Sequence, residues 1–179
     1  MRLAWEKISD RVIKINRFRS LRKKRFRLPN GAVGDFYTIN RPNIVCALVI
    51  TPDNKVVIAK QFRPGVERVM FELPGGRIDR RETPRQAVIR EVLEETGYRG
   101  HSRSLGRTSN DGWSDGWRHH FLFTNAKAAQ KPKNDEYEAI EVVTVSMKTF
   151  FTMLAEGKMT DGETAYRGLM ALGVLEVRR

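Results

Sequence analysis

Three glutamates in the segment Gly76–Tyr98 are spaced so that they could bind a metal ion together. If residues 85–96 form a helix, Glu91, Glu94 and Glu95 share one face, because positions i, i+3 and i+4 are neighbours on a helix. Carboxylates this close repel one another unless a positive charge lies among them. Hard divalent cations such as Mg²⁺ or Mn²⁺ favour carboxylate oxygens, and a bound ion can neutralise a substrate phosphate. The spacing fits a metal site, although a solvated acidic helix face would show the same pattern.

The helix that would carry these glutamates has clear start and stop signals. Thr83 is placed to be its N-cap, and Pro84 is well tolerated in the first turn. Gly97 supplies the C-terminal stop. The arc beside the glutamates is apolar and is expected to pack on a sheet; it holds Val88, Ile89, Val92 and Leu93.

The rest of the chain alternates between strand-like and helix-like patterns. Apolar and β-branched runs predict strands, with further strands broken by turns between residues 11 and 39. The predicted strands cover 43–50, 55–62, 69–73, 117–126 and 139–145, and two later helices cover 146–156 and 162–177. The first two of these strands are expected to form a central hairpin, and Pro-Asn-Gly (29–31) and Pro-Gly-Gly (74–76) predict turns. Strands and helices share one core, which indicates an α/β or α+β fold.

Length and composition exclude several classes of protein. A chain of 179 residues suffices for one ordinary domain with a core. The single Cys46 excludes an intramolecular disulfide and is expected to be a small buried residue. No stretch approaches the ~18 consecutive apolar residues of a membrane span, and no signal-peptide pattern opens the chain. We therefore expect no membrane partner and a cytoplasmic location.

The positive charge is concentrated near the N-terminus. Residues 1–27 contain eleven Lys or Arg and two acidic residues and hold +9 of the net charge of +12. A nucleic-acid arm is one interpretation of this segment. We favour the other, a solvated basic edge of half-exposed strands near an anionic substrate, because apolar residues are interleaved with the charges.

The glutamates belong to a longer pattern that resembles the Nudix box at every position. It runs Gly76, five residues, Glu82, seven residues, Arg90-Glu91, apolar Val92, one residue, Glu94-Glu95, one residue, Gly97, Tyr98. Gln61-Phe62-Arg63 and the stretch Glu72–Asp79 look like the ADP-ribose pyrophosphatase branch of that family. The resemblance implies a Nudix α/β/α sandwich with a mixed sheet, plus N-terminal antiparallel strands. It also implies a strand extension over residues 1–42 and a Nudix domain over 43–179.

The resemblance also implies roles for individual residues around the metal. Glu91 and Glu95 would bind Mg²⁺ or Mn²⁺ directly, with Glu94 as a further ligand or as direct support. The main-chain carbonyl of Gly75 or Gly76 would add another oxygen.

Further roles concern catalysis and substrate binding. Arg90 and Glu82 would orient the carboxylates by ion pairing, and Arg90 and Glu94 would count among the catalytic residues. Arg63 would contact a substrate phosphate. Glu136 would be the catalytic base, with Glu138 as the alternative.

Two N-terminal residues and a partner subunit complete the expectation from the family. Phe36 and Tyr37 lie where the branch stacks a nucleobase, although ordinary strand packing would also account for them. Members of the branch are usually homodimers whose N-terminal strands reach over the partner's active site.

The implied function is hydrolysis of the diphosphate in a nucleoside diphosphate joined to another group, as in ADP-ribose or another nucleotide sugar. The products would be a nucleoside monophosphate and a sugar phosphate. Nucleoside triphosphates or capped RNA are alternative substrates, and a Nudix-fold module that binds nucleic acid is a third interpretation. The chain departs from many ADP-ribose enzymes because no proline lies between Pro84 and Pro132. Its loop 108–117 leaves the substrate open, and adjacent His119 and His120 point to opposite faces of a strand and cannot share one ion.

Overall fold

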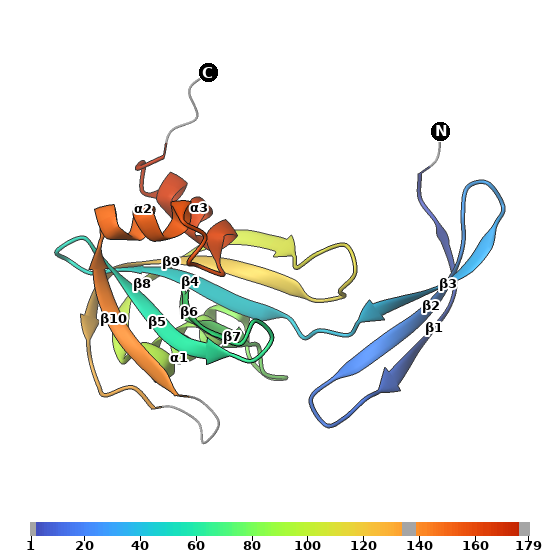
Figure 1. Ribbon diagram of the computed structural model, residues 1–179, viewed down its shortest axis with the longest axis horizontal. Coiled ribbons are helices and arrows are strands. Elements are labelled where there is room, and N and C mark those ends of the chain that lie inside the picture. The colour runs from blue at the N-terminus through green and yellow to red at the C-terminus, as the bar shows by residue number, and fades with distance from the viewer. Residues whose placement is uncertain (1–2, 134–138, 176–179) are drawn as a thin grey trace. The chain divides into compact units, whose positions relative to one another are not determined.

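The computed structural model describes residues 3–133 and 139–175, and the chain divides into two compact units (Figure 1). The N-terminal unit contains the residues up to Asn43 together with Thr108–Trp117. The central unit contains Ile44–Arg107 and the residues from Arg118 onward. The assignment of residues 1–42 and 43–179 to different functions stays a prediction.

The N-terminal unit is a three-stranded antiparallel sheet in the order β1-β2-β3, formed by Glu6–Lys14, Ser20–Arg27 and Val33–Ile39. The predicted turn after β2 forms, and Gly31 adopts a φ of 85° there. The rings of Trp5, Phe26 and Phe36 pack together, with centroids 4.9 to 6.0 Å apart. This aromatic cluster supplies one face of the small sheet with packing of its own.

The central unit is built on a seven-stranded mixed sheet with the order β10-β5-β4-β9-β8. Two short strands lie off this path, since β6 pairs with β5 and β7 pairs with β4. The strands are β4 (Ile44–Ile50), β5 (Lys55–Arg63), β6 (Arg68–Glu72), β7 (Gly75–Arg77), β8 (Tyr98–Ser109), β9 (Trp117–Ala128) and β10 (Ile140–Ser146). Strands β4 and β9 run parallel, whereas β4 and β5 are antiparallel.

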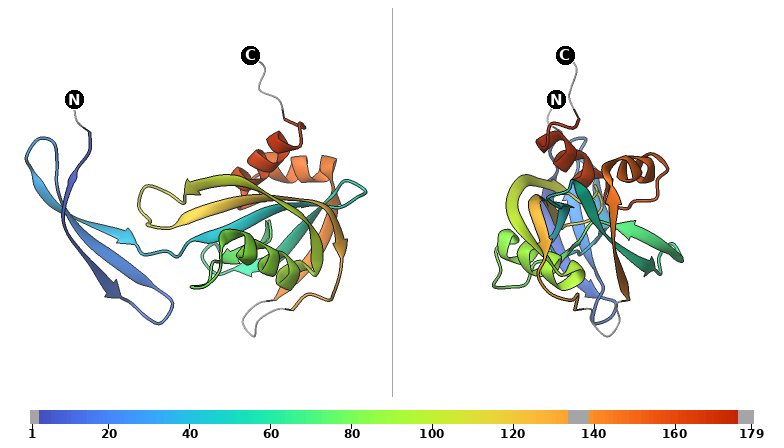
Figure 2. Two further views of the ribbon diagram at one scale, coloured as in Figure 1. Left: turned by 180° about the vertical axis from the view of Figure 1, so that it is seen from behind. Right: turned by 90° about the vertical axis from the view of Figure 1, so that its left-hand side faces the viewer.

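Helices cover both faces of this sheet, which confirms the predicted α/β/α sandwich (Figure 2). The helices are α1 (Pro84–Thr96), α2 (Met147–Ala155) and α3 (Gly162–Ala171). Alternate residues of β4 point to opposite faces: Val45 packs in the cluster of α1, and Cys46 packs in the cluster of α2 and α3. The continuous apolar run of β4 is therefore explained by burial on both sides.

The central hairpin is present but shorter than predicted. The pairing of β4 with β5 is confined to the turn end, at Val49 with Val57 and Ile50 with Val56. The other end of β4 pairs with β7, a strand formed where the sequence predicts only a turn. Glycine permits this pairing, because a Cβ on Gly75 would lie 2.2 Å from the carbonyl oxygen of Val45.

The structure departs from the sequence-based expectations at three further places. Helix α3 ends at Ala171 rather than at residue 177, and Gly173 turns the chain with a φ of 71°. Strand β8 was not predicted, because its sequence is rich in Arg, Ser and Gly. Ile89 is 42% exposed and does not pack on the sheet as expected. Within the described part of the chain, helices stay too short and too polar to cross a lipid bilayer.

Candidate active site

Helix α1 begins and ends where the sequence predicts. Thr83 Oγ1 accepts from the Gln86 amide at 3.3 Å, and Gln86 Oε1 accepts from the Thr83 amide at 2.9 Å, so a capping box closes the first turn. At the other end Gly97 adopts a φ of 76° and donates its amide to Leu93 O at 2.9 Å. Ala87 and Val92 on the inner side are fully buried. The helix is thus fixed at both ends and along one face, and its glutamates have a defined position.

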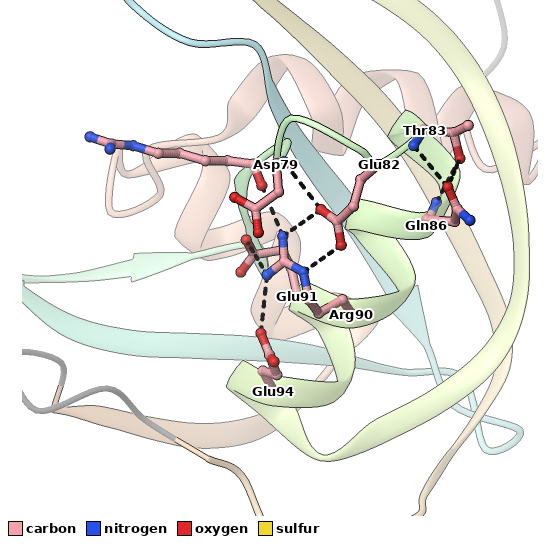
Figure 3. A network of polar contacts seen from close by, with 8 residues as sticks. Asp79, Glu82, Thr83, Gln86, Arg90, Glu91 and Glu94 are labelled. Atoms are coloured by element: carbon pink, nitrogen blue, oxygen red, sulfur yellow. Dashed lines mark hydrogen bonds and ion pairs between the residues drawn. The ribbon is translucent and has the colours of Figure 1, made fainter.

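Arg90 lies at the centre of a network of carboxylates (Figure 3). Its Nε and Nη2 donate to both oxygens of Glu82, at 2.7 and 2.9 Å. Its Nη1 donates to Glu91 Oε1 at 3.0 Å and to Glu94 Oε2 at 3.1 Å, and Nη2 also donates to the carbonyl of Arg77 at 3.0 Å. The planar guanidinium therefore holds three glutamates in fixed orientations, which an ammonium group could not do.

The charges in this network shift the pKa of Glu82 and of Arg90. The hydrogen bond from Arg90 holds the pKa of Glu82 below its usual range. The same hydrogen bond, followed by those to Glu94 and Glu91, raises the pKa of Arg90 further above its ordinary value, against the effect of burial. Glu82 therefore stays ionised at neutral pH and keeps its ion pair with Arg90.

Two glycines bring the backbone of β7 against the same carboxylates. The amide of Gly75 donates to Glu95 Oε2 at 2.9 Å, and Glu95 is only 9% exposed. A Cβ on Gly76 would lie 2.3 Å from Glu91 Oε1. Glu91 and Glu95 therefore face the glycine strand: the absence of a side chain on Gly76 permits the approach of Glu91, and the amide of Gly75 holds Glu95.

Arg63 lies at the end of β5 and is paired with a buried glutamate. Its Nε donates to Glu72 Oε1 at 2.7 Å, and its Nη2 pairs with Glu72 Oε2. Gln61 Nε2 also donates to Glu72 Oε2 at 3.1 Å. The hydrogen bonds to Glu72 raise the pKa of Arg63. The Arg63 side chain remains 47% exposed, so it is accessible for the predicted contact with a substrate phosphate.

The predicted base-stacking residues lie on opposite faces of β3. Phe36 packs in the aromatic cluster with Trp5 and Phe26. Tyr37 is 52% exposed, and Lys23 Nζ lies 5.7 Å from the centre of its ring. The predicted base Glu136 and its alternative Glu138 lie outside the described residues.

Two buried side chains, His120 and Cys46, have surroundings that are typical of structural residues. His120 is fully buried, its Nδ1 lies 2.8 Å from Thr164 Oγ1, and burial lowers its pKa to about 4. His119 is partly exposed, and burial also lowers its pKa. Cys46 is buried as expected, and desolvation raises the pKa of its thiol.

Comparison with known proteins identifies the family. Residues 40–167 match the family model described as NUDIX domain. The chain belongs to the Nudix family. It is 30% identical over 142 residues to an ADP-ribose pyrophosphatase of Bacillus subtilis, covering 78% of this chain and 77% of that protein. It is also 30% identical over 141 residues to a GDP-mannose pyrophosphatase of Yersinia enterocolitica, covering 75% and 69%.

A solved structure supports the same fold over nearly the whole chain. The crystal structure of an ADP compounds hydrolase superposes with a TM-score of 0.80, covering 98% of this chain and 96% of that chain. At 15% sequence identity this likeness concerns the fold alone. Both the sandwich and the N-terminal strands therefore belong to an architecture that this solved structure also has.

The Nudix box residues fit a hard divalent cation in their chemistry. Glu91, Glu94 and Glu95 supply carboxylate oxygens, and the glycine strand supplies main-chain carbonyls, which are the ligands that Mg²⁺ and Mn²⁺ prefer. Glu94 has the most accessible side chain, at 42% exposed against 14% for Glu91. In residues 3–133 and 139–175, however, no three acidic, His or Cys side chains converge as a complete metal centre. Arg90 and the Gly75 amide occupy oxygens of these carboxylates, and the ligand assignment stays a prediction.

Sequence reasoning missed one buried acidic residue beside the glycine strand. Asp161 is 8% exposed, and Arg118 Nη1 donates to its Oδ1 at 2.5 Å. Its place directly before the predicted helix at Gly162 is typical of an N-cap, which gives no indication of a contact with the Nudix site. Its contact with the amide of Leu73 joins residues 88 positions apart, and no local sequence signal indicates it.

Proposed function

We propose that this Nudix hydrolase cleaves the diphosphate of a nucleoside diphosphate joined to another group, releasing a nucleoside monophosphate and a sugar phosphate. One observation carries the proposal: a single guanidinium, that of Arg90, fixes Glu82, Glu91 and Glu94, while Glu95 is fixed by the glycine strand. A solvated acidic helix would gain nothing from such fixed carboxylates. The relatives named ADP-ribose pyrophosphatase and GDP-mannose pyrophosphatase support the substrate class.

The residues of the chain have distinct tasks in this proposal. Glu91, Glu94, Glu95 and a glycine carbonyl would hold Mg²⁺ or Mn²⁺, and the ion would neutralise the diphosphate and lower the pKa of a nearby water. Arg90, with Glu82 behind it, keeps the carboxylates in the orientation seen here. The Nη1 side of the Arg63 guanidinium binds a phosphate oxygen, because Glu72 already holds its Nε and Nη2.

The remaining tasks concern the base, the nucleobase and a second subunit. Glu136, or alternatively Glu138, removes the proton from the attacking water. Exposed Tyr37 stacks on the nucleobase, and Phe36 supports its strand from the aromatic cluster. The protein forms a homodimer and works in the cytoplasm. Light scattering after gel filtration tests the dimer, and a monomer at micromolar concentration would contradict it.

A substrate panel tests the proposed activity. Hydrolysis of ADP-ribose, GDP-mannose, other nucleotide sugars, dinucleoside polyphosphates and nucleoside triphosphates is measured with Mg²⁺, and products are identified by mass. We expect turnover of a nucleotide sugar that falls by orders of magnitude in Glu95→Gln. The matched control is Glu141→Gln, which neutralises an exposed glutamate on β10 that pairs with Lys60 at 2.7 Å. Retained turnover in Glu95→Gln, or turnover of triphosphates alone, would contradict the proposal.

Binding of nucleic acid is the second candidate, and the basic N-terminal unit is the observation that favours it. Many of its cations are already used inside the unit, however. Lys23 pairs with Asp35 at 2.7 Å, Arg22 pairs with Asp10 at 2.9 Å, and Lys24 pairs with Asp115. Measured RNA affinity with a steep salt dependence would support this candidate, and an absence of binding near physiological salt would remove it.

A further inference from the structure

The chain segment between β6 and β7 is held at successive peptide groups. The amide of Leu73 donates to Asp161 Oδ2 at 3.1 Å, and Pro74 O accepts from the amide of Ala47 at 2.9 Å. The amide of Gly75 then donates to Glu95 Oε2 at 2.9 Å. Two carboxylates from different helical regions therefore hold the two ends of this short segment, and the segment leads directly to the glycines that touch Glu91 and Glu95.

Asp161 occupies the N-cap position of α3 without acting as its cap. An N-cap aspartate ordinarily accepts a hydrogen bond from an amide of the first helical turn. Within the described residues the Asp161 side chain caps no amide of α3. Its oxygens accept instead from Leu73 N, from Thr160 Oγ1 at 3.0 Å and from Arg118 Nη1 at 2.5 Å. The carboxylate therefore holds the segment that leads to Gly75 and Gly76, and it does not cap the helix that it precedes.

Burial makes this arrangement specific. The side chain of Asp161 is 11% exposed, and Arg118, at 24%, provides the opposite charge. A buried carboxylate is stable when it is paired and its oxygens accept further hydrogen bonds. All three donors come from separate elements, since Leu73 follows β6, Arg118 lies on β9 and Thr160 lies on the connection between α2 and α3.

That connection also runs beside β6. The amide of Phe71 donates to Lys158 O at 3.4 Å, and the amide of Thr160 donates to Phe71 O at 3.3 Å. Phe71 and Met159 form an isolated parallel bridge. The stretch from Phe71 to Leu73 is therefore fixed from the side of α3, and Gly75 is fixed from the side of α1.

We propose that Asp161, oriented by Arg118, is a positioning residue of the Nudix site: it sets where the Gly75–Gly76 strand lies relative to Glu91 and Glu95. The expected effect on turnover rests on the proposed function. Loss of the Leu73 anchor frees one end of the segment, and a shift of the glycine strand moves both carboxylates that it touches. A displacement of about 1 Å in a catalytic site can cost on the order of 100-fold in rate.

The test compares Asp161→Asn with a matched variant, Asp53→Asn. Asp53 accepts from Thr51 Oγ1 at 2.6 Å and pairs with Lys55 at 2.9 Å in the turn between β4 and β5, far along the sheet from the glycine strand. We expect Asp161→Asn to lower kcat by about 10- to 100-fold with little change in KM, and to weaken Mn²⁺ binding measured by electron paramagnetic resonance. Asp53→Asn should change neither.

The Tm separates positioning from plain stability. All measurements are made at least about 15 °C below the Tm of the weakest variant, so that each protein is folded. If Asp161→Asn lowers the Tm but keeps the kcat and Mn²⁺ affinity of the wild type, Asp161 is only a packing residue and the inference is wrong. Should that variant not fold, Arg118→Lys takes its place, because it keeps the charge and alters only the orientation of Asp161.

Failure of the proposed function has a different signature. A wild-type protein without turnover on any member of the panel would contradict that function. The Mn²⁺ affinities of the wild type and Asp161→Asn would then decide the positioning role without any substrate. A difference between them would support the role, and equal affinities would overturn it.

Discussion

Substituting each of the two adjacent glycines of β7 should distinguish an effect on catalysis from an effect on the stability of the fold. A Cβ on Gly76 would lie 2.3 Å from Glu91 Oε1, against about 3.3 Å for an ordinary carbon–oxygen contact. The obstacle is the end of a flexible side chain, so in Gly76→Ala the Glu91 carboxylate retreats by about 1 Å and the backbone stays in place. Neither glycine adopts a positive φ, and alanine is therefore compatible with both backbones. We expect kcat/KM to fall about 100-fold and the free energy of unfolding to fall by about 1 kcal/mol or less.

The neighbouring substitution meets backbone rather than a side chain. A Cβ on Gly75 would lie 2.2 Å from Val45 O and 2.8 Å from the Cα of Cys46, both in the central strand β4. Overpacking of this kind costs about 1–3 kcal/mol or more, and each kcal/mol lowers the Tm by about 2–4 °C in a chain of this size. Gly75→Ala should therefore lower the Tm well beyond Gly76→Ala. Equal Tm losses, or wild-type turnover in Gly76→Ala, would refute the reasoning.

Two further substitutions test charge and pH. Arg90→Lys loses the paired contacts with Glu82 and should lower kcat/KM at least about 10-fold; Glu82→Gln added to it should cost little more, because both changes remove one contact. His120 has a folded pKa of about 4 against 6.5, so only the unfolded state gains its proton as the pH falls through this window. Stability is full above pH 6.5 and should be lower by about 2 kcal/mol at pH 5; urea unfolding of His120→Gln should show a flatter profile.

Helix α1 could be predicted to the residue because its signals are local. Thr83 and Gln86 satisfy the first turn, and Gly97 takes the left-handed conformation that ends the last one. The apolar runs of β4 and β5 were equally legible, since burial on both faces requires continuous apolar sequence. The residues that determine such elements lie close together in the sequence.

The elements that could not be predicted depend on distant partners. Strand β7 consists of Gly-Gly-Arg, has no strand propensity and exists because β4 accepts it. Ile89 continues the apolar period of α1 but lies outside the arc that the sheet covers. The contact of Asp161 with Leu73 spans 88 residues of sequence, and no local pattern announces it.

The spacing of the Nudix box follows from these contacts when they are taken in order. The five residues between Gly76 and Glu82 let the chain turn back toward α1. Both carboxylate oxygens of Glu82 can then bind Arg90, which lies eight residues later. Arg90 must then precede Glu91 and stand four residues before Glu94, because one nitrogen serves both. Gly97 has to be glycine for two reasons, its φ of 76° and a Cβ position 2.2 Å from Gln130 O. The spacing of the box is therefore set by three features: the Arg90 guanidinium, the Gly75–Gly76 strand and the end of α1 at Gly97. The effect of a substitution at any position of the box should depend on which of these three features it disturbs.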